Sequence, residues 1–96
     1  MNDITGTWRL RMSTPIGPIE ADYEFTRTGD HLTGTADGTP LENLEAHPGD
    51  RYTWSQRITK PLRLNLTYDV TVTGDDLTGE SRAGRLPRTE VTGRRR

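Results

Sequence analysis

Three side chains with hydrogen-bonding chemistry stand where the sequence predicts an apolar surface. Gln56 occupies an inward position of a predicted strand, where the matching position of an earlier segment holds Leu10. A buried amide without partners costs about 1–3 kcal/mol, so we expect Gln56 to contact a ligand, a water molecule or the hydroxyl of Tyr23 or Tyr68. Tyr23, Gln56 and Tyr68 are therefore the candidate catalytic residues, as hydrogen-bond donors to a folded substrate.

Other ionisable residues predict no second centre. His31 and His47 stand in predicted turns without a predictable carboxylate partner, which does not make a metal site. Glu45 and Glu90 occupy equivalent positions of a repeat and could face each other as an acid/base pair, but their apolar neighbours fill the inward positions better. The sequence has no phosphate-binding loop, dinucleotide fingerprint or nucleophile elbow, so we expect no cofactor.

The chain contains an internal repeat that positions these residues. Trp8 aligns with Trp54 at an offset of 46, and the segment 23–34 aligns with 68–79 at an offset of 45. Eight of the twelve positions in the second pair of segments are identical. We interpret residues 1–96 as a single domain made of two units of about 45 residues, spanning roughly 5–48 and 51–94.

Each unit is predicted to form four antiparallel strands, because apolar and polar residues alternate along it. The expected strands span 6–13, 19–28, 31–37 and 41–47, then 51–59, 64–73, 76–83 and 87–94. Short Gly-Asp turns connect several of them. The fold class is therefore all-β, and we expect an eight-stranded up-and-down barrel, with a two-sheet sandwich as the alternative.

Alternation also predicts which side chains line the barrel. The expected ligand-binding residues are Trp8, Leu10, Met12, Tyr23, Phe25, Trp54, Gln56, Ile58, Leu66 and Tyr68. Small inward residues such as Ala21, Gly34 and Gly79 favour either interdigitated packing or the wall of a cavity. The loops at one end carry Ile16, Leu62 and Leu86, which would form either a mouth or a cap.

Composition excludes several classes of protein. The 96 residues include no cysteine, so disulfides and thiolate metal sites are excluded, and we expect the cytoplasm. No apolar run is long enough for a membrane span and no secretory signal is recognisable. The aromatic residues point inward and the net charge is −1, which argues against nucleic acid. The arginines 94–96 are expected to form a frayed tail.

A family resemblance agrees with the barrel. Gly6-Thr7-Trp8, within a predicted meander, resembles the Gly-x-Trp opening of the calycins, which include lipocalins and avidins. The segments 4–8 and 32–35 are similar to the avidin opening, but the later tryptophans and the polar biotin ring of avidins have no counterparts. The whole pattern also resembles small lipocalin-like bacterial proteins. The resemblance implies a hydrophobic small molecule held in the lumen.

Three functions remain open at this point. The first is a lipocalin-like barrel that binds a hydrophobic or aromatic small molecule, whose anionic group would be attracted by the basic residues expected near the mouth, Lys60, Arg63, Arg85 and Arg88. The second is a small barrel isomerase or cyclase of a natural-product pathway. The third is a packed accessory subunit that binds another protein through its strands or rim. A homodimer is a further expectation.

Overall fold

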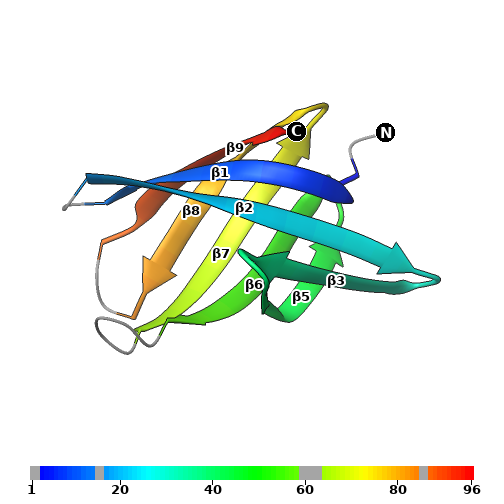
Figure 1. Cartoon of the computed structure of the whole chain (residues 1–96), viewed down its shortest axis with the longest axis horizontal. Helices are drawn as coiled ribbons and strands as arrows, with labels where there is room; N and C mark the ends of the chain where they lie inside the picture. The colour runs from blue at the N-terminus through cyan, green and yellow to red at the C-terminus, as the bar shows by residue number, and fades with distance from the viewer. Residues whose placement is uncertain (1–2, 15–16, 59–63, 85–86) are drawn as a thin grey trace.

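The structure, a computed structural model, describes residues 3–14, 17–58, 64–84 and 87–96. These residues form one antiparallel sheet of nine strands that curls into a nearly closed barrel, with β1 and β2 crossing in front of β6–β8 (Figure 1). The strands are β1 (Gly6–Thr14), β2 (Gly17–Thr28), β3 (His31–Ala36), β4 (Thr39–Pro40), β5 (Glu42–His47), β6 (Arg51–Ile58), β7 (Leu64–Thr73), β8 (Asp76–Ala83) and β9 (Thr89–Arg95). The predicted all-β antiparallel class is confirmed.

The first and last strands pair with each other. Trp8 to Met12 of β1 lie opposite Val91 to Arg95 of β9, with Leu10 facing Gly93. The complete order is β4-β3-β2-β1-β9-β8-β7-β6-β5, so every pairing except β1 with β9 joins strands that are consecutive in the chain. This pairing brings the two ends of the sequence to the same side of the barrel (Figure 1).

The predicted number of eight strands is wrong, because a ninth forms at Thr39–Pro40, between the expected strands 31–37 and 41–47. Asp37 and Gly38 both have positive φ, 49° and 89°, which is typical of a tight hairpin turn. The chain therefore reverses at once, and β4 pairs with the end of β3 through Thr39 and Pro40. Strand β4 ends at Pro40, and the predicted strand 41–47 begins at Glu42 as β5.

The barrel consequently has an open seam between β3–β4 and β5, the two ends of the sheet. The β3–β4 pairing extends by one hydrogen bond toward this seam, because Leu41 N–H, just before β5, donates to Gly34 O at 2.9 Å. The strands at the matching place in the second half, β8 and β9, pair over six residues, from Asp76 to Ser81. The two halves therefore differ in their strand pairing at this place. The internal duplication remains a prediction that rests on the sequence alone.

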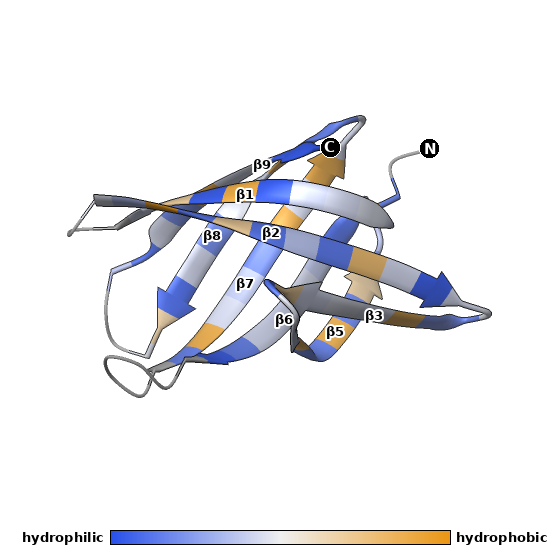
Figure 2. Cartoon of the chain, viewed as in Figure 1, coloured by the Kyte–Doolittle hydropathy of each residue, from blue (hydrophilic) through white to orange (hydrophobic). Residues whose placement is uncertain are grey.

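The interior is packed by side chains from both halves, and hydrophobic residues alternate with hydrophilic ones along the strands (Figure 2). A Cβ added to Gly34 would lie 2.8 Å from the Phe25 ring, and one added to Gly79 would lie 2.8 Å from Val70 Cγ1. The small inward residues therefore receive the side chains opposite them. At these two positions the structure favours interdigitated packing over a cavity wall.

Arg95 closes one end of the barrel. Its guanidinium lies 4.4 Å from the ring centre of Trp8, and its Nε lies 3.1 Å from a carboxylate oxygen of Asp75. The indole N–H of Trp8 donates to Ile4 O at 2.7 Å, and Ile4 itself is fully buried. The guanidinium also donates to three backbone carbonyls, those of Asp3, Thr5 and Gly74. We call this group of contacts the Arg95 plug.

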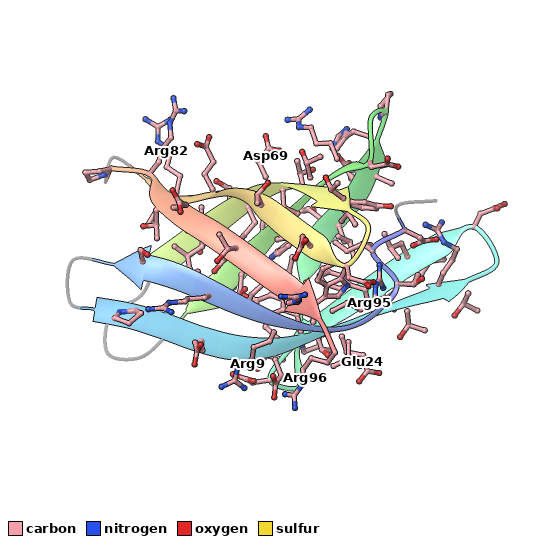
Figure 3. The ribbon with its side chains drawn as sticks, turned by 90° about the horizontal axis from the view of Figure 1, so that it is seen from above. Arg9, Glu24, Asp69, Arg82, Arg95 and Arg96 are labelled. Carbon is pink, nitrogen blue, oxygen red and sulfur yellow. The ribbon has the colours of Figure 1, made fainter. Side chains whose placement is uncertain are left out.

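The expected frayed tail at 94–96 is therefore wrong. Strand β9 continues to Arg95, and Arg96 N–H donates to Thr7 O at 2.9 Å. The Arg96 side chain forms an ion pair with Asp22 at 3.0 Å. Figure 3 shows Arg95 turned toward the barrel, whereas Arg96 and Arg9 point away from it. Two of the three arginines, Arg95 and Arg96, are thus held in place by contacts with the barrel.

Candidate functional site

The end of the barrel opposite the Arg95 plug has incompletely buried inward residues. Met12 lies opposite Ile19, and Gln56 lies opposite Leu66, so each pair shares one face of the sheet. Met12 is only 8% exposed. Ile19 is 46% exposed, and among the described residues it is the one large hydrophobic residue whose side chain is exposed. Ala21, Gln56 and Leu66 are half-buried. We call these five residues the open end.

Polar contacts join the open end to two tyrosines below it. The Tyr23 hydroxyl donates to Gln56 Oε1 at 2.8 Å, across 33 residues of sequence. The Tyr68 hydroxyl lies 3.2 Å from the sulfur of Met12, which is a weak acceptor. The structure thus brings together the three candidate catalytic residues, and it gives the Gln56 amide the tyrosine partner that its inward position required.

Below these contacts the lumen is filled by aromatic rings. Trp54 stacks on Tyr68 with ring centres 5.0 Å apart and planes 12° from parallel. Its ring centre also lies 5.4 Å from that of Phe25 and 5.9 Å from that of Tyr23. The indole N–H of Trp54 is buried and has no hydrogen-bond partner among the described residues, unlike that of Trp8. An unpaired buried donor costs about 1–3 kcal/mol, so an acceptor at this point would stabilise the protein.

The two inward tyrosines are kept in their neutral form. Burial raises the pKa of Tyr23, the neighbouring Tyr68 raises it further, and the hydrogen bond to Gln56 offsets part of the rise. Burial also raises the pKa of Tyr68, with a smaller opposing contribution from its contact with Tyr23. Both phenols therefore stay protonated at neutral pH, where they can donate hydrogen bonds but cannot act as general bases.

The raised pKa values predict a loss of stability in alkali. Unfolding returns Tyr23 and Tyr68 to their ordinary pKa of 10.0, so the unfolded chain loses these protons first as the pH rises. The free energy of unfolding should then fall above pH 10, by up to about 1.4 kcal/mol per pH unit for each tyrosine. Urea unfolding from pH 9 to 11 measures this slope. The Tyr23→Phe/Tyr68→Phe variant should show a shallower slope, and equal slopes would contradict the assignment.

The structure distributes the ten expected ligand-binding residues over two levels. Those deep in the packed lumen are Trp8, Leu10, Tyr23, Phe25, Trp54 and Tyr68. Met12, Gln56 and Leu66 lie at the open end. The side chain of Ile58 lies outside the described residues, as do the expected rim residues Ile16, Leu62 and Leu86 and the basic residues Lys60, Arg63 and Arg85. Arg88 is described, and it contacts Glu80 at 3.3 Å.

The other ionisable residues are not brought into a centre. Glu45 lies on β5 and Glu90 on β9, and three strands separate them in the sheet. His47 Nε2 lies 2.7 Å from the Thr53 hydroxyl and 3.9 Å from Glu45. Within the described residues, no group of three or more histidine, aspartate or glutamate side chains is suited to hold a metal ion.

A groove of about 460 Å³ lies on the outer face of β5–β8, where the alternation of the sequence predicts no hollow. The outward residues lining it are Asn43, Glu45, Thr53, Ser55, Thr67, Asp69, Glu80 and Arg82. Asp69 and Arg82 point away from the barrel in Figure 3. Asn43 has a φ of 55°, and the register shifts between Glu42 and Glu45, so a bulge bends β5 beside the groove. Periodicity in the sequence does not report this curvature.

Comparison with known proteins supports the fold alone. No family model matches the chain, and no curated protein matches it. A solved structure described as a redesigned beta barrel matches with a TM-score of 0.71 at 15% identity, covering 97% of this chain and 91% of that one. The barrel is thus supported, but the calycin family is not. Within the described residues, no helix is long and apolar enough to cross a membrane.

Proposed function

We propose that the protein binds a small hydrophobic molecule at the open end of its barrel. The observation that carries this proposal is the exposure of Ile19 on the inward face, above the half-buried Ala21 and Leu66. Apolar surface left open at the mouth of a barrel is typical of a ligand site. The deep lumen is packed, so the ligand would occupy the upper level only.

The polar groups below the open end suggest which ligand fits. Gln56 is half-buried, and its amide nitrogen remains a donor when Oε1 accepts from Tyr23. Donors in an apolar surround favour a ligand with an acceptor oxygen at one end. The calycin resemblance agrees with an apolar or aromatic body for the rest of the molecule.

Binding of anilinonaphthalene sulfonate, an aromatic anion that fluoresces in apolar surroundings, tests the proposal. We expect saturable one-to-one binding to the native protein. Ala21→Trp should fill the open end and abolish it, because the half-buried Ala21 faces the lumen beside Leu10. Gln56→Leu should weaken it by about tenfold, the value of one hydrogen bond of about 1.4 kcal/mol.

Ala46→Trp is the matched control for Ala21→Trp. Ala46 is exposed on β5, away from the open end, so the same added bulk should leave the affinity unchanged. Equal affinities for wild type, Ala21→Trp and Ala46→Trp would refute the site.

The protonated phenol of Tyr68 favours a second candidate, the isomerase or cyclase. A barrel that folds a flexible substrate needs only a dry surface and fixed hydrogen-bond donors. Tyr68, whose hydroxyl contacts the weak acceptor sulfur of Met12, and the Gln56 amide, which Tyr23 holds by a hydrogen bond, can supply such donors. Isomerisation conserves mass, so ligands extracted from the purified protein are compared by chromatographic retention. A carrier gives one species in wild type and Tyr68→Phe alike. An isomerase gives product in wild type and its precursor in the variant.

A further inference from the structure

The open seam between β4 and β5 is separate from the open end, and it exposes a strand edge. Strands β4 and β5 end the sheet, and within the described residues no strand pairs with the free edge of β5. Unpaired backbone N–H and C=O groups on such an edge are a template for another strand. We propose that the seam binds an extended basic segment of a partner protein, which adds as a strand along β5.

Incompletely buried apolar residues gather at the seam as well as at the open end. Leu32 of β3, Leu41 between β4 and β5, and Leu44 of β5 are half-buried and pack against the core. The other two members of this half-buried set, Ala21 and Leu66, belong to the open end. The three leucines would be covered by the apolar side chains of an added strand. The partner segment should therefore alternate apolar residues with residues of another kind.

The charge of the seam indicates which residues should stand at the outward positions of the partner segment. Residues 28–50, which form β3, β4, β5 and their turns, contain five carboxylates and no lysine or arginine. Natural edge strands are commonly protected by lysine, and this edge lacks that protection. Within the described ranges, no arginine or lysine forms an ion pair with Glu42 or Glu45, and Glu45 lies 3.9 Å from His47. The outward positions of an added strand would thus be suited to lysine or arginine.

The same charges disfavour a second copy of the chain at the seam. Two β5 strands paired side by side would bring Glu42 and Glu45 of both copies together, and like charges across a strand pair are destabilising. A basic partner instead gains from the field of all five carboxylates. The occupant we infer is therefore a basic segment of a different protein.

A blocked eight-residue peptide of alternating lysine and valine, labelled with a fluorophore, tests the inference by anisotropy at low salt. We expect saturable binding to the native protein. Glu42→Lys/Glu45→Lys should lower the affinity by about tenfold, because two attractive charge pairs with lysines of the peptide become repulsive. The matched control, Glu24→Lys/Glu90→Lys, reverses two exposed carboxylates on β2 and β9 and should leave the affinity within twofold.

A second peptide separates strand addition from simple charge attraction. N-methylation of alternate residues removes the N–H groups of one edge and keeps every charge, so binding along β5 should be lost. Equal affinity of the methylated and unmethylated peptides would overturn strand addition, and equal affinity of the two double variants would overturn the site. If sedimentation shows a dimer of the native protein that Glu42→Lys/Glu45→Lys dissociates, the seam binds a second copy and the inference is wrong.

Discussion

Replacing Arg95 with alanine is expected to destabilise the protein by about 3 kcal/mol, which lowers the melting temperature by about 12–24 °C in a chain of this size. The guanidinium donates to the backbone carbonyls of Asp3, Thr5 and Gly74, and it covers the ring of Trp8 at 4.4 Å. Its loss removes these three hydrogen bonds and uncovers the ring of Trp8 at the end of the barrel. Urea unfolding followed by tryptophan fluorescence measures the change.

Arg94→Ala is the control, because Arg94 precedes Arg95 on β9 and is exposed. It removes the same charge without touching the Arg95 plug, and a surface change of this kind should stay within about 0.5 kcal/mol. A similar loss for both variants would mean that net charge, and not the plug, stabilises the barrel.

Gly79→Ala is the second variant with a large expected effect. A Cβ at this position would clash with Asp69 O and lie 2.6 Å from Val70 Cα, and both are backbone atoms of the paired strand β7. Because β7 is held between β6 and β8, the clash cannot be relieved by a side-chain rotation. We expect a destabilisation of about 3 kcal/mol or more, at the upper end for an overpacked site.

Two other glycines provide a graded control. At Gly34 the closest atoms belong to Phe25 and Leu41 side chains, at 2.8 and 3.0 Å, and at Gly93 they belong to Leu10, at 3.0 Å. Side chains can move, so alanine should cost about 1–2 kcal/mol at Gly34 and less at Gly93. Denaturant midpoints should rank the variants in that order. A Gly79→Ala protein as stable as Gly93→Ala would show that β7 and β8 are less tightly coupled than the structure indicates.

Much of the fold could be predicted because alternation is a local property of the sequence. A period of two fixes which face each side chain occupies, and the inward phase of Trp8, Tyr23 and Tyr68 follows from it. The bond between Tyr23 and Gln56 spans 33 residues, yet both lie on inward positions, so a polar residue there indicated its partner.

The features that the sequence did not reveal depend on distant backbone or on unusual φ angles. Arg95 has its role because carbonyls more than 20 residues away converge on it, and a charge run at the end of a chain carries no sign of them. The seam arises from the tight turn at Asp37 and the bulge at Asn43, whose φ values of 49° and 55° are not predictable from alternation. The outer groove lies beside the same bulge. Alternation predicts which face of a strand a residue occupies, but it does not predict how the strand curves.

Because β1 pairs with β9, the two ends of the chain could be joined and the chain opened elsewhere without changing the strand pairing of the barrel. If the two ends were joined by a short linker and the chain were opened at the seam, at Leu41, the strand sequence would become β5-β6-β7-β8-β9-β1-β2-β3-β4. That sequence is the spatial order of the sheet itself, so every strand would pair only with its neighbours in the chain. Such a circular permutant has a lower contact order and should fold faster than the natural chain. In the present connectivity, β1 and β9 can pair only by closing a loop that contains all the other strands.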